Sequence, residues 1–253
     1  MIQRARRYTN IKEAIFFSNL VRLAGGYALS QVEYYGISYA IDRFRRNGIF
    51  QKLLAYYPLL TPEGPGASKN IISASYALSF TGPFTYGNGV AGDGLTAYAS
   101  GGITPALLLS VNNTTLGFFT KATTYEACND MGMHFFDISA WGIFGATTLN
   151  SAYSNPNSFN IAIASPQGSN VCTVDGANVY GVKDGITVYT AAAAAGSFVP
   201  DELFIFGYNF FGAPSQLSSR TYLSYYIGNG LTEAQAKKIN NIETTYNKTI
   251  GRL

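Results

Sequence analysis

The sequence predicts a mainly β protein, a sandwich or barrel with a helical segment before it and one helix after it. Only 12% of the 253 residues are charged, against about 25% in typical domains. Tyr, Phe, Gly, Ser, Thr and Asn are abundant, which is the composition of strands and tight turns. After residue 66, short strand-like runs alternate with turn residues, without the helices that βαβ units need. The length suits one sizeable core.

Two amphipathic helices are predicted near the N-terminus. The first spans residues 10–29, where apolar residues recur at helical spacing until Gly25-Gly26 ends or bends the helix. Its apolar stripe is formed by Phe16, Leu20, Leu23 and Tyr27. A second stripe is formed by Ile37, Ile41 and Phe44, and Asn47-Gly48 has the composition of a helix C-cap.

The clearest boundary in the chain lies at residues 61–66, "TPEGPG", where two prolines and two glycines occupy six positions. Before it, the run "IFQKLLAYY" predicts a third, short helical piece that stops at Pro58. We therefore expect a helical, basic attachment segment at 1–60 and a β-sandwich at 61–253.

Strand-like segments follow this boundary, with turn residues between them. They are "ASYALSF", "ALLLSVN", "TLGFFTKA", "MHFFDIS", "SFNIAIA", "GITVYTA", "ELFIFGYN" and "TYLSYYIG". The last strand leads into a predicted helix at about 231–251. Thr232 is its N-cap, Gln235 completes a capping box, and Gly251 can end the helix.

Positive charge is concentrated at the N-terminus. The first 60 residues hold nine Lys or Arg and three acids, whereas the whole chain has a net charge of +3. This asymmetry indicates either a basic arm that meets an acidic partner or a solvated helical face. The candidate partner-attachment residues are Arg4, Arg6, Arg7, Lys12 and Arg22.

The two cysteines, Cys128 and Cys172, are too few for a disulfide framework, and their separation fits no zinc motif. We expect them to be reduced and half-buried. Arg22 interrupts the apolar run that begins at Ala14, so no signal peptide is expected, and no stretch reaches the roughly 18 apolar residues of a membrane helix. A protein made and used in the cytosol, or released without secretion, is the resulting expectation.

A formal G-x-G-x-x-G pattern occurs in "YGNGVAGDG", at Gly87, Gly89 and Gly92. In a nucleotide site this pattern must follow a strand and open a helix. Here Asp93-Gly94 adds another turn and "LTAYA" is strand-like, so a hairpin loop is favoured. No cofactor is expected.

The sequence also offers little for catalysis or metal binding. No two carboxylates are two residues apart, and Glu126 and Asp130 would lie about 13 Å apart on one strand face. His134 is the sole histidine, and metal sites usually need three or four ligands. Asp175-Gly176 and Asp184-Gly185 are expected to form turns. We expect no catalytic residues and no metal site, although distant carboxylates could converge in the fold.

Three stretches carry a family resemblance: "AIDRFRRNGIFQKLLAYYPLL", "ALSFTGPFTYGNGVAGDGLTAYA" and "SSRTYLSYYIGNGLTEAQAKKINNIETTYNKTIGRL". They resemble blocks of concanavalin A-like (LamG-like) jelly-roll proteins, in the form associated with structural proteins of tailed bacteriophages of the crAss-like, Bacteroidetes-infecting type. The resemblance runs from about Ser38 to Leu253 and is sharpest at "IGNGLTEA", residues 227–234. Between Gly101 and Pro200 it extends only to the pattern of strands and turns.

The resemblance implies a phage virion protein, a head or tail fibre or decoration component attached through its N-terminal segment. Its expected partners are other virion proteins and further copies of the chain, without nucleic acid or membrane insertion. The alternative is a lectin-like module that binds host-surface or mucus glycans, with exposed aromatics such as Trp141 as stacking surfaces. A capsule-degrading glycosidase or lyase is a third hypothesis, disfavoured because carboxylates do not cluster along the chain.

Overall fold

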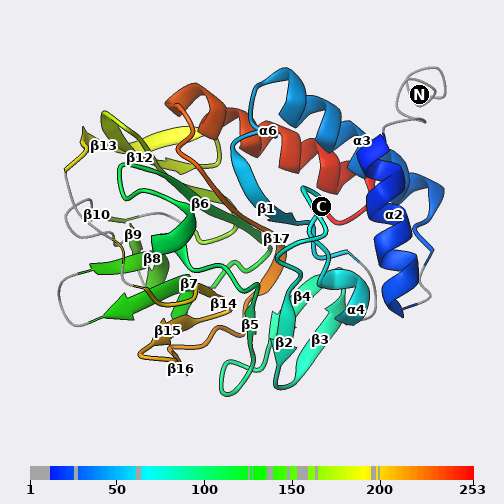
Figure 1. Cartoon of the computed structure of the whole chain (residues 1–253), viewed down its shortest axis with the longest axis horizontal. Coiled ribbons are helices and arrows are strands. Elements are labelled where there is room, and N and C mark those ends of the chain that lie inside the picture. The colour runs from blue at the N-terminus through cyan, green and yellow to red at the C-terminus, as the bar shows by residue number, and fades with distance from the viewer. Residues whose placement is uncertain are drawn as a thin grey trace.

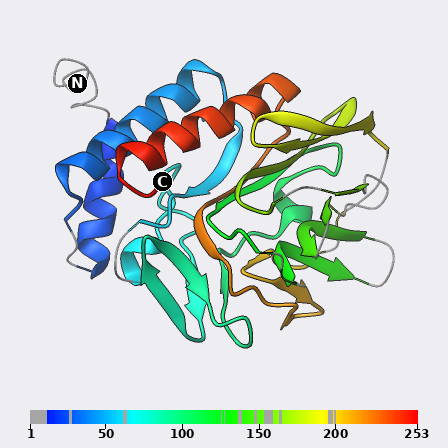
Figure 2. The same cartoon turned by 180° about the vertical axis from the view of Figure 1, so that it is seen from behind.

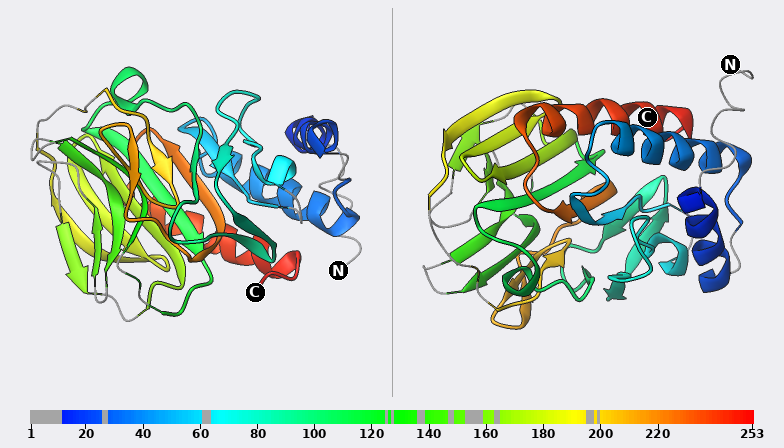
Figure 3. Two further views of the ribbon diagram at one scale, coloured as in Figure 1. Left: turned by 90° about the horizontal axis from the view of Figure 1, so that it is seen from below. Right: turned by 45° about the horizontal axis from the view of Figure 1, so that its top comes forward.

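The computed structural model describes residues 12–25, 28–60, 64–124, 126, 128–135, 139–146, 149–152, 159–162, 165–194, 198 and 200–253. Within these residues, the side chains of 23–25, 64, 65 and 134–162 are not described. The chain forms two packed β-sheets, and its long helices gather on one side of the sandwich (Figures 1 and 3). The predicted mainly β class, with N-terminal helices and a C-terminal helix, is confirmed.

The first sheet, sheet A, is antiparallel in every strand pair that the structure describes. Its order is β13 (Ile186–Ala192), β12 (Asn178–Lys183), β11 (Gly168–Asp175), β6 (Asn113–Thr120), β17 (Thr221–Gly228), β4 (Gly89–Gly92) and β3 (Phe84–Gly87). β1 (Leu53–Tyr57) pairs with the C-terminal half of β17, beyond β4. β17 therefore has neighbours along both edges.

The second sheet, sheet B, faces sheet A across the core. Its order is β10 (Phe159–Ala162), β9 (Leu149–Ala152), β8 (Ser139–Ala146), β7 (Cys128–Phe135), β14 (Phe204–Ile205), β5 (Tyr98–Ser100) and β2 (Ser79–Thr81). β15 (Tyr208–Phe210) lies parallel to β7 and forms a hairpin with β16 (Ala213–Ser215). Figure 2 shows this hairpin, in gold, at the lower border of the sandwich.

The central strands of sheet A, β11, β6 and β17, are buried on both faces. Toward sheet B, β17 contributes Tyr222 and Tyr225 to a core that also contains Phe118, Phe206 and Met131. On the opposite face, a second apolar cluster joins the sheet to the helices and contains Tyr226, Tyr56, Ile41, Phe44, Ile239 and Tyr246. A central strand buried on both faces reads as a near-continuous apolar run, and "TYLSYYIG" is such a run.

Helices α3 (Gln31–Arg46) and α6 (Glu233–Thr249) lie side by side over sheet A, in blue and red in Figures 1 and 2. Their close approach requires Gly36, because a Cβ there would lie 2.6 Å from the Ile250 side chain. The expected stripe of α3 is buried, and its C-cap is Asn47. The expected capping box of Thr232 and Gln235 is confirmed.

The first helix, α2 (Lys12–Gly25), forms as expected but packs through a different face. The predicted stripe included Phe16, which is 41% exposed, whereas Ala14, Phe17 and Val21 are fully buried. Leu20 is half-buried, and Tyr27 lies outside the described residues. Both stripes have helical spacing, so the spacing alone could not select the face that meets α3 and α4 (Gly64–Ala67).

Two predicted elements are wrong. The run "IFQKLLAYY" was expected to be helical, but residues 53–57 form β1, because Ala55, Tyr56 and Tyr57 are buried beside β17. The run "ALLLSVN" was expected to be a strand, but residues 105–108 form the short helix α5 (Pro105–Leu108), in which Leu107 is 79% exposed. Tertiary packing overrode short-run propensity in both cases. The division at residue 60 stays a prediction, although β1 belongs to sheet A.

Several turns follow the predicted chemistry. Gly87 and Gly89 flank the β3–β4 hairpin with positive φ values of 157° and 124°, so the glycine-rich pattern is a hairpin and not a phosphate loop. Asp175-Gly176 and Asp184-Gly185 connect β11, β12 and β13. The cysteines are free, as expected, but Cys128 and Cys172 are buried rather than half-buried.

A buried carboxyl joins α6 to sheet A. Glu243 is fully buried and accepts hydrogen bonds from Tyr56 Oη (3.3 Å), Ser169 Oγ (3.4 Å) and Ser224 Oγ. Burial raises the pKa of this carboxyl to about 7, and the hydroxyl donors and Arg252 only partly oppose the rise. The folded protein therefore binds a proton at Glu243 over a pH range in which the unfolded chain does not.

This proton predicts a pH dependence of stability. Below pH 4.5 the carboxyl is protonated in both states, and its stabilising contribution is complete. As the pH rises to about 7, the unfolded chain ionises first, so about 3 kcal/mol of stability is lost over this range. Glu243→Gln should remove that slope. Urea denaturation of both proteins from pH 4 to 8 checks this, and parallel curves would contradict it.

Candidate functional site

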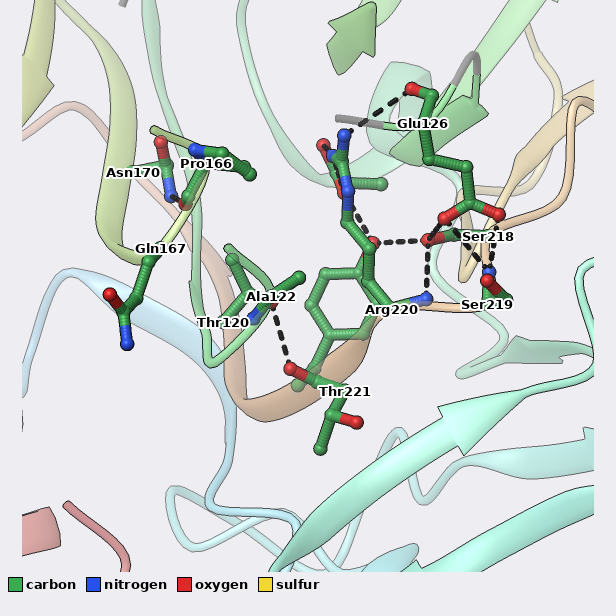
Figure 4. Close-up of polar contacts among 12 residues, drawn as sticks. Thr120, Ala122, Glu126, Pro166, Gln167, Asn170, Ser218, Ser219, Arg220 and Thr221 are labelled. Atoms are coloured by element: carbon green, nitrogen blue, oxygen red, sulfur yellow. Dashed lines mark hydrogen bonds and ion pairs between the residues drawn. The ribbon is translucent and has the colours of Figure 1, made fainter. Parts of the chain in front are cut away.

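A polar hollow lies at one rim of the sandwich, where the connection after β6 meets the segment that enters β17. It is an open depression with about 410 Å³ of space for water-sized molecules. The lining residues are Lys121, Ala122, Thr123, Thr124, Glu126, Ser219, Arg220 and Thr221. We call this hollow the rim pocket, and Figure 4 shows most of its polar contacts.

The end of the β6–β17 ladder brings the two segments together. Tyr222 is the register partner of Thr120, and beyond this pair Lys121 N donates to Thr221 O at 2.9 Å. Thr120 Oγ1 donates to the same carbonyl at 2.8 Å and accepts from Ala122 N at 3.1 Å (Figure 4). These bonds fix the backbone where the chain leaves the sheet. Thr123 and Thr124, which follow directly, are exposed to solvent.

Glu126 connects the two sides of the pocket, the segment after β6 and the segment before β17, through hydrogen bonds. Its carboxylate accepts from Ser219 N at 2.9 and 3.1 Å and from Ser218 Oγ at 3.4 Å (Figure 4). A third loop, the turn between β4 and β5, packs against the same place. A Cβ on Gly94, which has a φ of 71°, would lie 3.1 Å from Ser219 Cβ, so this turn requires glycine.

An ion pair lies under the pocket. Arg220 Nη1 donates to both carboxylate oxygens of Asp130, at 2.8 and 3.0 Å, and the two residues are 4% and 0% exposed. Nη2 of Arg220 donates to the Glu126 carbonyl at 3.3 Å, and Tyr222 Oη donates to Asp130. Since each charge has several partners, the arrangement meets the conditions under which a buried ion pair is tolerated.

The pKa shifts of Asp130 and Cys128 indicate that these buried groups have a structural role and are not reactive. Burial raises the pKa of Asp130, and Arg220 and Tyr222 oppose that rise. Burial also raises the pKa of the Cys128 thiol, with Asp130 adding to the effect, so this cysteine is not an activated thiolate. Asp130 is fully covered and has no open path to a ligand in the pocket.

The sequence predictions for this region need correction in one respect. Glu126 was expected to share a strand face with Asp130, but β7 begins at Cys128 and Glu126 precedes it. Instead, Arg220 donates to the Asp130 carboxylate and to the backbone carbonyl of Glu126. The Glu126 carboxylate accepts from Ser218 Oγ. Sequence reasoning did not find Arg220, although it is the sole charged residue between Glu202 and Glu233. A lone charge at the start of an apolar strand was the available signal.

Of the candidate attachment residues, the two that the structure describes, Lys12 and Arg22, do not line the rim pocket. Lys12 and Arg22 are exposed on α2. Arg4, Arg6 and Arg7 lie outside the described residues. His134 and Trp141 lie on β7 and β8, and their side chains belong to the part that is not described.

Two features are absent from the described residues. These residues contain no group of three His, Cys, Asp or Glu side chains that could hold a metal ion. Among the helices described, none has the length and apolar character needed to cross a membrane.

No protein-family model and no curated protein sequence matches the chain, but solved structures do. Domain 4 of AbnA, a GH43 extracellular arabinanase from Geobacillus stearothermophilus in complex with arabinotriose, matches with a TM-score of 0.55 and 14% identity. That match covers 75% of this chain and 98% of the arabinanase domain. The fold of this chain is a concanavalin A-like β-sandwich.

Two larger proteins contain the same fold. The binding domain of botulinum neurotoxin DC in complex with SialylT matches with a TM-score of 0.51 and 10% identity, over 78% of this chain and 52% of that one. A Trypanosoma rangeli sialidase mutant with trans-sialidase activity matches with a TM-score of 0.50 and 13% identity. That match covers 85% of this chain and 39% of the sialidase chain. This chain therefore spans about half or less of these two proteins. At such identities the similarity is one of fold.

The buried ion pair predicts a large difference between two identical substitutions. Arg220→Met leaves Asp130 buried without its counter-charge and should cost about 3 to 5 kcal/mol of stability. Arg46→Met breaks an ion pair with Asp42 in which the arginine side chain is 66% exposed, and should cost less than about 1 kcal/mol. Urea denaturation at pH 7 compares the two variants. Equal losses of unfolding free energy in the two variants would show that the buried ion pair stabilises the protein no more than the exposed one.

Proposed function

We propose that this protein is a glycan-binding module and that the rim pocket is its binding site. The observation that carries the proposal is a polar hollow of about 410 Å³ at the sandwich rim, lined by hydroxyl, ammonium and carboxylate groups. Sugars present many hydroxyls, which need donors and acceptors held at fixed positions. Two structures with the same fold are described in complex with arabinotriose and with SialylT, which supports the proposal.

The pocket is suited to binding because its walls are held before a ligand arrives. Thr123 and Thr124 are exposed, and the backbone before them is fixed by the bonds of Thr120 and Thr221. The opposite wall is anchored by Arg220 on Asp130. Preorganisation of this kind lowers the entropic cost of binding.

Binding without turnover is part of the same proposal. Glycoside hydrolysis uses two carboxyl groups on either side of the scissile bond. Here the Glu126 carboxylate is engaged by Ser218 and Ser219, and Asp130 is covered and paired with Arg220. Neither carboxyl is placed to act on a sugar that occupies the pocket.

The pocket hydroxyls provide the test. The double variant Thr123→Val/Thr124→Val keeps the side-chain shape but removes two hydroxyls, each of which is worth about 1 kcal/mol in a hydrogen bond. Its affinity for the glycans that bind the full chain on an array should fall about tenfold or more. Titration calorimetry with the strongest array ligand measures the loss.

Thr245→Val on α6 is the matched control, since Thr245 is exposed on a helix and does not line the pocket. It should bind as the unchanged protein does. An array without signal for the unchanged protein, or equal affinity in the double variant and the control, would refute binding at the rim pocket.

The virion role also remains a proposal. It rests on the sequence resemblance, and one structural observation favours an attachment surface on α2. The exposed face of α2 carries Lys12 and Arg22 together with Ile15 and Phe16, which are 43% and 41% exposed. Cations beside exposed apolar side chains are suited to an acidic protein partner. Other virion proteins, further copies of the chain and a location in the virion follow from this hypothesis.

Charge reversal on α2 tests this attachment. Lys12→Glu/Arg22→Glu should lower incorporation into phage particles several-fold, because the rim of an interface responds strongly to repulsive charge. Quantitative mass spectrometry of purified particles measures incorporation. Lys237→Glu/Lys238→Glu on α6 is the control with the same charge change. Unchanged incorporation of the α2 variant would contradict the attachment role.

A further inference from the structure

The tip of the β15–β16 hairpin exposes two adjacent phenylalanines. Phe210 pairs with Ala213 in the ladder, so the loop between the strands consists of Phe211 and Gly212. Phe210 and Phe211 are 39% and 38% exposed. Their ring centroids lie 4.7 Å apart, with the planes at 77° to each other. We call these two residues the aromatic tip.

The turn holds Phe211 in a conformation that its side chain disfavours. Phe211 and Gly212 have φ values of 53° and 83°, the pattern of a type I′ turn. Asn or Asp normally occupies the first of these positions, and a positive φ is a genuine outlier for a bulky residue. Such strain persists where the surroundings impose it, and it occurs preferentially at ligand sites.

Asn209 imposes the conformation. It is 3% exposed, its Oδ1 accepts from Gly212 N at 2.6 Å, and its Nδ2 donates to the Glu202 carbonyl at 3.0 Å. Asn209 therefore links the turn to the segment that precedes β14. As a result, the aromatic tip is a rigid surface, and a ligand that binds there loses little of its binding energy to ordering the protein.

We propose that the aromatic tip is a second binding site, which stacks the apolar face of a neutral sugar ring. The segment from Tyr208 to Ser215 has no charged residue, and the acids Asp201 and Glu202 are its nearest charged neighbours in the chain on the N-terminal side. These acids disfavour an anionic ligand. The C–H face of a pyranose or furanose fits an aromatic ring because the ring face carries partial negative charge.

Other occupants fit less well. A stable protein interface needs about 800 Å² from each partner, which is more than a two-residue turn and its flanks present. Lipid surfaces and nucleic acids both attract Lys and Arg, and the hairpin has neither. A single ring-shaped ligand with one apolar face is the occupant that matches the size and the charge of the tip.

The aromatic tip and the rim pocket lie toward opposite ends of β7. Phe210 is the register partner of His134 near the end of the strand, whereas Glu126 precedes its start. Eight residues of strand span about 26 Å, so one monosaccharide cannot occupy both sites. The second site therefore does not depend on the rim pocket, and a longer glycan or two glycans could engage both.

The test uses a substitution that the turn itself favours. Phe211→Asn places at this position a residue that adopts positive φ readily, so the variant should fold with an equal or higher melting temperature. Its affinity for neutral oligosaccharides should fall at least tenfold. Phe211→Tyr retains an aromatic ring and should bind within a factor of about three of the unchanged protein. Saturation-transfer NMR and calorimetry with arabinotriose, maltotriose and cellotriose provide the measurements, and sialyllactose serves as the anionic comparison.

The variants separate the two sites. Loss in Phe211→Asn but not in Thr123→Val/Thr124→Val supports the aromatic tip, and the reverse result leaves the rim pocket as the site and overturns the second one. Absence of saturation transfer from the unchanged protein to all three neutral sugars overturns the aromatic tip. Tighter binding of sialyllactose that is lost in Phe211→Asn would overturn its neutral specificity.

Discussion

Burial of β17 on both faces is the constraint on which the rest of the structure depends. This strand pairs with β6 along one edge and with β4 and β1 along the other. Its side chains must fill the space between the sheets on one face and the space beneath α3 and α6 on the opposite face. Five of its eight residues are Tyr, Leu or Ile, and each of the five is at most 1% exposed. The same strand therefore supplies side chains to both cores.

The polar groups at the ends of β17 follow from this burial. A strand covered on both faces cannot leave charges or backbone groups without partners where it meets the rim. At its start, Arg220 is neutralised by Asp130 from sheet B, and this pair supports the rim pocket. At its end, the turn into α6 is held by Thr115 and Thr173, whose hydroxyls accept from Leu231 N. The proposed binding site is thus a by-product of closing the sandwich at one rim.

Two buried carboxyls illustrate different solutions to the same problem. Asp130 faces a guanidinium that donates two hydrogen bonds to it, and Arg220 opposes the rise in the Asp130 pKa that burial causes. Glu243 is surrounded by the hydroxyls of Tyr56, Ser169 and Ser224, and its pKa rises to about 7. The first arrangement couples the two sheets through a buried ion pair. The second couples α6 to sheet A most strongly when the carboxyl is protonated.

The fold class, the amphipathic helix α3, the glycine hairpin and the capped C-terminal helix could all be predicted from the amino-acid sequence. Each depends on residues close together in the chain, such as Thr232 with Gln235 or Gly87 with Gly89. Local patterns could not assign "IFQKLLAYY" to a strand or choose the buried face of α2, because long-range neighbours decide both. The rim pocket could not be predicted from the sequence for the same reason. Arg220 lies 90 residues after Asp130 and 94 after Glu126 in the sequence. The pairing of β17 with β6 and the packing of the two sheets bring these residues together.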